Sequence, residues 1–472
     1  MINTLTQNKI FIETYGCQMN EYDTELIKAI LVKENYAFVP TENEADIVML
    51  NTCAIRENAH RKVYGRIHDI RHRREGRPVM IGLLGCMATN LRKDLLEDRK
   101  LKIDLIAGPD SYKRLPELIR EATLTGERSY DVTLSEFETY SDITPLRKEG
   151  VNAWLAVMRG CNNFCTFCVV PYTRGRERSR APENIVEEVR RLAGEGFKQV
   201  TLLGQNVNSY RYEEADFADL IDQVSRVEGI ERIRFTSPHP KDFPEKLLKV
   251  VAENPKACKH IHLPMQSGND RVLDMMNRTY TQKEYLELVD KIRTLSPHIA
   301  LTTDIIVGFP TETDTEFEDT FKVAEAVRFD SAFTFKYSER KGTVASQKFP
   351  DDVAEKVKTE RIMRLIDLQK RVSLEKNREH IGQVQEIMIE SLSTTRSDEE
   401  IQGRTDGNKL VIIPLNCHPR AGGDPVLDSR FRGWNDKEKP KLGDFLNVRI
   451  TGATPNVLKG VPMGTIPASS KN

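Results

Sequence analysis

Three closely spaced cysteines constrain this chain more than any other feature of its sequence. Cys161, Cys165 and Cys168 form the pattern C-x3-C-x2-C within Arg-Gly-Cys-Asn-Asn-Phe-Cys-Thr-Phe-Cys. Three thiolates on one short loop can bind three irons of a [4Fe–4S] cluster and leave the fourth iron without a protein ligand. A closed zinc site is the alternative, but it needs a fourth ligand, and the next cysteine is Cys258. The loop therefore predicts a cluster with one open iron.

The length and composition indicate a globular protein of several domains. The chain has 472 residues, of which 39% are hydrophobic and 30% charged, with 70 Lys and Arg against 71 Asp and Glu. No apolar run is long enough to span a membrane, and the N-terminus lacks the basic and apolar regions of a secretory signal. We therefore expect a cytoplasmic enzyme with no membrane partner, whose cysteines are metal ligands or free thiols rather than disulfides.

Two local runs of basic residues stand out against this neutral balance. One extends over residues 56–77, and the other comprises Arg174, Arg176, Arg178 and Arg180, directly after the cysteine loop. Such runs are usually solvated helix faces. Beside a catalytic loop, however, arginines can also hold a phosphate backbone, so both interpretations stay open.

Residues 1–125 alternate short apolar strands with helical segments. This pattern predicts an open parallel sheet with helices on both faces. A polar segment, 126–150, reads as a linker. The expected strands are Lys9–Glu13, Asp46–Leu50, Pro78–Leu84 and Asp104–Ala107, and the first expected helix runs from about Glu21 to Lys33.

Cys17, Cys53 and Cys86 each lie just past the end of one of these expected strands. The carboxyl ends of parallel strands share one edge of a sheet, where ligands bind. Cysteines are also common there as small buried apolar residues. Because all three positions show the same placement, the sequence favours a second metal cluster.

The strand and helix alternation resumes over residues 151–378 and predicts a partial (β/α)6 barrel. Active sites of such barrels lie at the carboxyl ends of the strands, and the cysteine loop follows the first strand. A charged helix from about Val353 to Glu379 completes this part. The expected strands are Trp154–Met158, Gln199–Leu203, Arg232–Thr236, His260–Leu263, Thr302–Val307 and Ala332–Lys336.

Residues 379–466 predict a small antiparallel β-barrel interrupted by an inserted loop at about 415–440. The loop has neither strand nor helix periodicity and is rich in Gly, Pro, Asp and Arg, as surface or disordered segments are. Its adjacent Cys417 and His418 form a poor metal-ligand set. The expected strands are Val384–Ser391, Gly403–Asn408, Lys409–Ile413 and Phe445–Thr451.

Several long stretches resemble one family, the methylthiotransferases of the radical S-adenosylmethionine (SAM) superfamily. The resemblance covers nearly the whole chain: an N-terminal methylthiotransferase domain, a radical SAM domain and an OB-like TRAM domain. Gln-Met-Asn after Cys17 is similar to the tRNA-modifying members rather than to those that modify a ribosomal protein. The stretches are Tyr-Gly-Cys-Gln-Met-Asn-Glu-Tyr-Asp from Tyr15, Cys-Asn-Asn-Phe-Cys-Thr-Phe-Cys-Val-Val-Pro-Tyr from Cys161, Leu-Leu-Gly-Gln-Asn-Val-Asn from Leu202, Thr-Ser-Pro-His-Pro from Thr236, His-Leu-Pro-Met-Gln-Ser-Gly from His262 and Thr-Asp-Ile-Ile-Val-Gly-Phe-Pro from Thr303.

This resemblance implies two [4Fe–4S] clusters and SAM as cofactors. The loop cluster would cleave SAM to a 5′-deoxyadenosyl radical, while Cys17, Cys53 and Cys86 would hold an auxiliary cluster whose sulfur is methylated by another SAM. The methylthio group would then replace the C2 hydrogen of an N6-isopentenyladenosine on the 3′ side of a tRNA anticodon. The implied partners are that anticodon stem-loop, an electron donor and a sulfur donor.

Two alternatives to this function remain open. A methylthiotransferase could act on N6-threonylcarbamoyladenosine or on a ribosomal-protein aspartate, and a non-catalytic Fe–S or RNA-binding protein could have kept the fold. The candidate SAM contacts are Gly204, Gln205, Asn206 and Gly308, although glycines at strand ends also serve turn geometry. Further candidates for cluster, cofactor or substrate contacts are Phe164, Phe167, His239 and His262.

Overall fold

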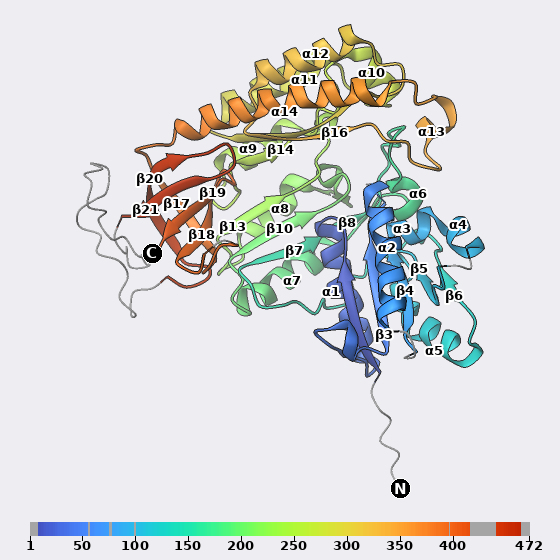
Figure 1. Ribbon diagram of the computed structural model, residues 1–472. Coiled ribbons are helices and arrows are strands. Elements are labelled where there is room, and N and C mark those ends of the chain that lie inside the picture. Colours follow the sequence, from blue (N-terminus) through green and yellow to red (C-terminus); the bar gives the residue numbers. More distant parts are fainter. Residues whose placement is uncertain are drawn as a thin grey trace.

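The computed structural model describes residues 8–54, 57–74, 78–98, 101–395, 397–415 and 440–463. Figure 1 shows three parts along the chain: an N-terminal α/β unit, a central unit of strands and helices, and a small C-terminal barrel at the opposite end of the molecule. Among these described residues, none of the helices combines the length and apolar character needed to cross a membrane.

The N-terminal unit is a six-stranded sheet in which every pairing is parallel, with the order β2-β1-β3-β4-β5-β6. Alternate residues of the strands enter two separate cores. Ile47 and Met49 face the core covered by α1 and α5, whereas Val48 and Leu50 face the core covered by α2, α3 and α4. The strands are Lys9–Thr14 (β1), Ala37–Phe38 (β2), Ile47–Thr52 (β3), Met80–Gly85 (β4), Leu105–Ala107 (β5) and Ser129–Asp131 (β6); the helices are Gln18–Lys33 (α1), Glu57–Arg73 (α2), Cys86–Asn90 (α3), Arg92–Glu97 (α4) and Leu115–Thr125 (α5), with 3-10 turns at Glu42–Glu44 and Tyr112–Arg114.

This arrangement confirms the predicted parallel sheet with helices on both faces. The sequence did not indicate the two edge strands β2 and β6, which have only two and three residues. Strand β6 and the fully buried Tyr140 both belong to segment 126–150. Much of the segment that reads as a linker is therefore packed against the N-terminal unit.

The central unit is a partial barrel of six parallel strands in two halves, β7-β10-β13 and β14-β15-β16. A parallel bridge between Ile233 and Ala257 connects β13 to the chain just before β14. All six predicted strands are present. They are Asn152–Ala156 (β7), Gln199–Leu203 (β10), Arg232–Phe235 (β13), His260–His262 (β14), Ala300–Val307 (β15) and Ser331–Lys336 (β16).

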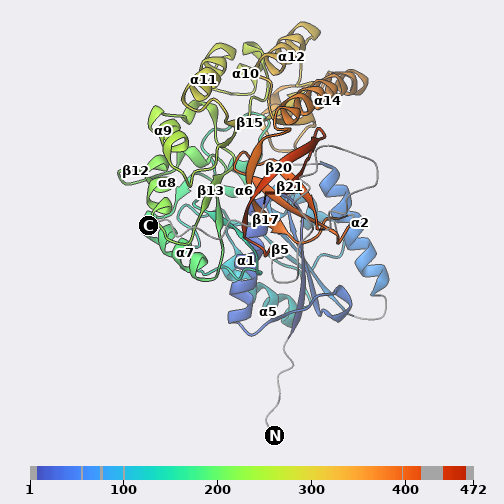
Figure 2. The same ribbon diagram turned by 90° about the vertical axis from the view of Figure 1, so that its left-hand side faces the viewer.

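Helices cover the outside of this partial barrel, as Figure 2 shows for α7, α8, α9 and α11. The predicted charged helix is α14, which runs along the molecule towards the C-terminal barrel (Figure 1). Two short antiparallel strand pairs lie outside the barrel strands: Met158–Arg159 (β8) pairs with Arg178–Ser179 (β9), and Arg211–Tyr212 (β11) pairs with Ala215–Asp216 (β12). There are 3-10 turns at Val207–Ser209 and Pro240–Asp242. The helices are Val170–Arg174 (α6), Pro182–Gly194 (α7), Phe217–Ser225 (α8), Glu245–Glu253 (α9), Asp270–Met275 (α10), Gln282–Leu295 (α11), Asp314–Val327 (α12), Val344–Lys348 (α13) and Glu355–Arg378 (α14).

The C-terminal unit is a closed five-stranded barrel with the order β17-β18-β19-β21-β20. The prediction of a small barrel is confirmed. The strand predicted at Gly403–Asn408 lies earlier in the chain, at Glu400–Thr405, because the residues after Thr405 form a turn. The last strand, Leu458–Pro462, was not predicted. The inserted loop with Cys417 and His418 lies outside the described residues. The strands are Val384–Ser391 (β17), Glu400–Thr405 (β18), Leu410–Pro414 (β19), Phe445–Ala453 (β20) and Leu458–Pro462 (β21).

Two arginines of β13 join the barrel to the central unit. Arg234 donates from Nη1 to the carbonyl oxygen of Asp406 at 3.0 Å and from Nη2 to that of Thr405 at 2.8 Å. Arg232 donates to the carbonyl oxygen of Arg404 at 2.6 Å. Because both arginines are buried, these contacts hold the barrel against the end of the parallel strands.

Candidate active site

The three N-terminal cysteines lie at the carboxyl ends of three neighbouring strands, as predicted. Cys17 is the N-cap of α1 after β1, Cys53 follows β3 directly, and Cys86 follows β4 as the first residue of α3. Gly16 allows the first two to approach, because a Cβ at this position, where φ is +137°, would lie 2.5 Å from the Cβ of Cys53. The sheet therefore brings these side chains together at one edge.

The thiols of this first set differ in acidity. A hydrogen bond from the Cys53 side chain lowers the pKa of Cys17 to about 6, and the charge of Arg174 acts in the same direction against the effect of burial. Burial raises the pKa of Cys86, although Arg174 donates from Nε to its Sγ at 3.0 Å. A cationic side chain thus faces thiols that would have to be ionised to bind metal.

The second set lies on the loop between β8 and α6. Gly160 begins this loop with φ of +78°, and a Cβ there would lie 1.9 Å from the carbonyl oxygen of Arg176. The loop is held by hydrogen bonds from the Cys161 amide to the Gly175 carbonyl at 3.1 Å and from the Cys168 amide to the Cys165 carbonyl at 2.9 Å. Burial raises the pKa of Cys161 and of Cys168 to about 12, so these thiols need a metal or another positive charge to ionise.

A cavity of about 380 Å³ lies between the two sets. Its walls include Cys17 from the N-terminal unit and all three cysteines of the loop. Cys86 lies nearby, where it packs with Ala54 and with Val169, the residue after Cys168. The structure therefore brings Cys17 of the N-terminal set and the whole loop set to one cavity, with Cys86 packed beside it.

Each of the two sets has the donor chemistry of a [4Fe–4S] cluster. Three thiols would bind three irons and would leave the fourth iron without a protein ligand. No three Cys, His, Asp or Glu side chains in the described part of the chain are gathered tightly enough for a single ion. A cube differs from such an ion because each of its thiolates binds a separate iron.

Two of the four candidate SAM contacts line the cavity. Gly204 and Gln205 both form part of its wall, and Gln205 Oε1 is buried without a hydrogen-bond partner among the described residues. Asn206 lies behind the wall, where it donates to Asp242 Oδ2 at 2.9 Å. Gly308 does not line the cavity either. A Cβ at this position would lie 2.3 Å from Cγ of Lys358. The backbone at 308 thus packs against this lysine.

The aromatic and histidine candidates divide in a similar way. Phe167, His239 and His262 line the cavity. Phe164 instead contacts Tyr172 edge to face, with 6.1 Å between ring centroids. Burial, with the charge of Arg278, lowers the pKa of His239 to about 2. His239 is therefore neutral and can serve as a polar contact but not as a cation.

For three of the four arginines after the cysteine loop, both predicted roles, a solvated helix face and a phosphate-binding site, were wrong. Arg174, Arg178 and Arg180 are buried and pair with Asp23, Asp110 and Glu188 respectively, at 2.7 to 2.9 Å. They form neither a solvated face nor a free phosphate site, because carboxylates occupy them: Glu188 lies eight residues after Arg180, whereas Asp23 and Asp110 lie 151 and 68 residues before their partners. Arg176 alone is exposed, and its guanidinium lies 4.3 Å from the ring centroid of Phe164.

Several arginines of the basic run at 56–77 are also held by partners. Arg66 pairs with Glu13 at 2.6 Å and with Glu42, and Arg71 pairs with Asp104 at 2.6 Å. Arg74 is buried and donates to backbone carbonyls, including that of Ala45 at 2.6 Å. These arginines fix helix α2 to the sheet.

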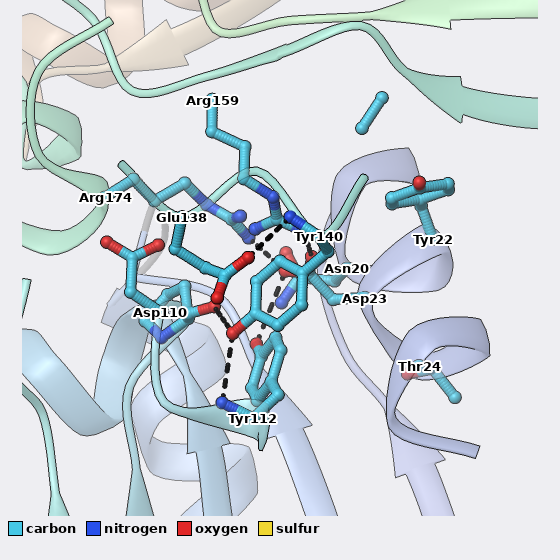
Figure 3. Close-up of polar contacts among 12 residues, drawn as sticks. Asn20, Tyr22, Asp23, Thr24, Asp110, Tyr112, Glu138, Tyr140, Arg159 and Arg174 are labelled. Atoms are coloured by element: carbon cyan, nitrogen blue, oxygen red, sulfur yellow. Dashed lines mark hydrogen bonds and ion pairs between the residues drawn. The ribbon is translucent and has the colours of Figure 1, made fainter. Parts of the chain in front are cut away.

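Sequence reasoning missed a buried ion cluster at the boundary between the two units. The Asp23 carboxylate accepts from Arg159 Nη2 at 2.6 Å and from Arg174 Nη2 at 2.7 Å, and all three side chains are at most 3% exposed (Figure 3). Burial acts to raise the pKa of Asp23, but the two guanidinium groups outweigh it and hold the pKa below its ordinary value. Asp23 lies three residues after Asn20, the last residue of Gln-Met-Asn, and no local pattern marks its partners.

The cavity also contains polar residues that the sequence did not single out. Arg278 is buried and donates to Cys165 Sγ at 3.4 Å. At strands β15 and β16 the wall includes Asp304 and Lys336. The position of these two on the strands that close the barrel could have indicated them.

Comparison with known proteins identifies each of the three parts. Residues 9–108 match an uncharacterized protein family (UPF0004), residues 155–324 the radical SAM superfamily, and residues 378–463 the TRAM domain. The fold of the chain resembles that of the radical SAM methyltransferase TsrM from Kitasatospora setae, with a TM-score of 0.55 at 14% identity over 72% of this chain and 77% of that one.

Curated relatives match almost the whole chain. The tRNA-2-methylthio-N(6)-dimethylallyladenosine synthase of Phocaeicola vulgatus is 44% identical over 96% of this chain and 95% of that protein. The enzyme of the same name from Porphyromonas gingivalis strain W83 is 47% identical over 96% and 95%. The one from Prosthecochloris aestuarii is 48% identical over 86% and 92%. The chain therefore belongs to the tRNA-2-methylthio-N(6)-dimethylallyladenosine synthase family of radical SAM enzymes.

Proposed function

We propose that this protein adds a methylthio group to C2 of N6-isopentenyladenosine, on the 3′ side of the anticodon in tRNA. The observation that carries the proposal is the cavity shared by two cysteine sets from different domains. The loop set would hold the cluster that cleaves SAM, and the N-terminal set would hold the cluster that provides sulfur. Sulfur insertion requires the radical and the sulfur to reach the same substrate atom, so both clusters must adjoin one cavity. The names of the relatives supply the substrate.

The cysteines of the two sets would hold one [4Fe–4S] cluster each. The cluster on Cys161, Cys165 and Cys168 would supply the electron that cleaves one SAM, and the cluster on Cys17, Cys53 and Cys86 would supply the sulfur, which a second SAM methylates. The C2 hydrogen leaves on 5′-deoxyadenosine. An electron donor and a sulfur donor complete the reaction, which we place in the cytoplasm.

The remaining residues bind and orient. Gly204 and Gln205 form the cavity wall beside the loop, and we assign them to SAM, whereas Asn206 and Gly308 would act through the backbone behind it. His262 and Asp304, joined at 3.2 Å, lie in the wall on β14 and β15, and we assign them to contact with the adenine. The burial of Cys161 and Cys165 would help to shield the radical from water.

The three domains divide the work. We assign sulfur delivery to residues 1–125, radical chemistry to 151–378 and tRNA binding to 379–466, with 126–150 between the first two. A TRAM barrel of the OB-like type suits single-stranded RNA. An anticodon loop can present an unstacked base to a pocket, as single-stranded loops do.

Nucleoside analysis of tRNA tests the substrate. A strain that lacks the gene should lose 2-methylthio-N6-isopentenyladenosine and accumulate N6-isopentenyladenosine, and the gene supplied in trans should reverse both changes. Persistence of the methylthio nucleoside would overturn the proposal. Loss of methylthiolated threonylcarbamoyladenosine, or of a methylthio group on a ribosomal protein, would point to the other substrates.

A further inference from the structure

The ion cluster between the N-terminal and radical domains carries an excess of positive charge. Asp23 is one carboxylate, but it is paired with two guanidinium groups, those of Arg159 and Arg174 (Figure 3). Its other contact, the hydroxyl of Tyr112 at 3.3 Å, is neutral. The neighbouring pair of Asp110 and Arg178 balances itself. Within these ion pairs one positive charge is therefore left over, and a negative group beside them must match it.

Arg174 directs its remaining donors away from this carboxylate. Its Nε donates to Cys86 Sγ at 3.0 Å. Its Nη1 is buried and has no hydrogen-bond partner within the described ranges. Arg174 comes from the radical domain, six residues after Cys168, whereas Cys86 belongs to the N-terminal sheet. The guanidinium therefore links the cysteine loop of one domain to a proposed cluster ligand of the other.

The charge of the proposed auxiliary cluster equals the missing negative charge. A [4Fe–4S] core in its common oxidised state, held by three thiolates, has a net charge of about −1. Ionised Cys17, Cys53 and Cys86 with such a core would neutralise the excess at Asp23.

We propose that Arg174 is a positioning residue for the auxiliary cluster, which it holds through Cys86 while its charge raises the reduction potential of that cluster. This inference depends on the proposed second cluster. Reduction adds a negative charge to the cluster, and a buried cation close to a ligand sulfur stabilises the reduced state. Asp23 acts in the opposite direction, because its carboxylate offsets the charge of Arg174.

The test isolates the auxiliary cluster. In a chain with Cys161, Cys165 and Cys168 changed to Ala, anaerobic reconstitution should leave about four irons per chain. The midpoint potential of this cluster is then measured by a redox titration followed by electron paramagnetic resonance. The same measurement is made with Arg174→Gln, Arg174→Lys and Asp23→Asn added to that chain.

The signs of the shifts distinguish an electrostatic role from a structural one. Arg174→Gln should shift the midpoint to more negative potential, and Arg174→Lys should recover most of the shift because it keeps the charge. Asp23→Asn should shift the midpoint the other way. Arg147→Gln is the matched control: Arg147 is a buried arginine that pairs with Glu188 and Glu25, and its loss should leave the potential unchanged.

The outcomes separate this inference from the function on which it depends. If the chain without the loop cysteines binds no iron, the proposed second cluster is wrong. If it binds iron but Arg174→Gln leaves the potential unchanged, or both Arg174→Gln and Asp23→Asn shift it in the same direction, the role of Arg174 is wrong. If Arg174→Gln or Asp23→Asn does not retain iron, the midpoint potential of the other variant tests the role of Arg174. A shift in the predicted direction supports that role, and no shift or the opposite direction overturns it.

Discussion

Lys409 of the C-terminal barrel places its ammonium nitrogen 2.8 Å from Oδ1 of Asp330 in the radical domain. Lys376 of α14 lies 2.7 Å from the other carboxylate oxygen. The Asp330 side chain is 8% exposed, and burial acts to raise its pKa, but the two lysines outweigh this effect and hold the pKa below the ordinary value of 3.8. One carboxylate thus joins the barrel, α14 and the parallel strands.

This contact predicts a pH-dependent stability. Because the folded pKa is lowered, the ionised carboxylate stabilises the protein above pH 3.8, and the contribution is lost as the pH falls through the lower folded pKa. Asp330→Asn should cost about 2 kcal/mol at pH 7, and the difference from the parent should shrink below pH 3.8. Calorimetry at stepped pH measures it. The exposed Asp222→Asn is the control, and a difference independent of pH would contradict the prediction.

The contacts of Arg234 predict that the barrel can be loosened without unfolding. Arg234→Met removes the donors to Thr405 and Asp406; the Asp406 carbonyl loses its partner at a buried contact, while that of Thr405 still accepts from the Asn408 amide, at a cost of about 2 kcal/mol. Hydrogen exchange should accelerate at residues 404–409, while β17 and β20 stay protected by their own ladder. Arg226→Met, on an exposed helix end, should change nothing. Unchanged exchange at 404–409 would show that other contacts hold the barrel.

The geometry of Gly160 predicts that the cysteine loop does not tolerate a side chain at its start. Gly160→Ala would place Cβ against the carbonyl of Arg176 at a positive φ, which should cost about 2 kcal/mol or more. Iron bound by the loop should fall with it. Gly194→Ala, at the end of α7 with open space around it, should stay within about 0.5 kcal/mol. Equal behaviour of the two variants in thermal unfolding would refute this account.

The two cysteine sets should be separable by mutation. Replacing Cys17, Cys53 and Cys86 together by Ala should lower the iron content from about eight to about four per chain. SAM should still be cleaved to 5′-deoxyadenosine, but no methylthiolated tRNA should form. Replacing the three loop cysteines should abolish cleavage. A first variant that no longer cleaves SAM would contradict this division.

The sequence predicted those parts of the fold that depend on local patterns. The apolar run Gln199–Leu203 is bounded by turn residues, and its bounds match β10. The placement of Cys17, Cys53 and Cys86 at strand ends follows from the same reasoning, because parallel strands share an edge. Strand β2 has too few residues to show a period, and it becomes a strand only through its pairing with β1.

The sequence could not predict contacts made by distant residues. Arg174 and Arg178 resemble a basic surface in the sequence because their partners are distant: Asp23 lies 151 residues before Arg174, and Asp110 lies 68 residues before Arg178. Gly308 follows a barrel strand and so resembled a cofactor contact, but the stem of Lys358 on α14 occupies the space beside it. Both features depend on tertiary packing.

Asp23 has a further consequence for how the protein is made. Its two charged partners are synthesised 136 and 151 residues after it, so the N-terminal sheet leaves the ribosome with this carboxylate unpaired. Water must solvate Asp23 until the first strands of the radical domain arrive. A transplanted N-terminal domain therefore needs a host that supplies both arginines.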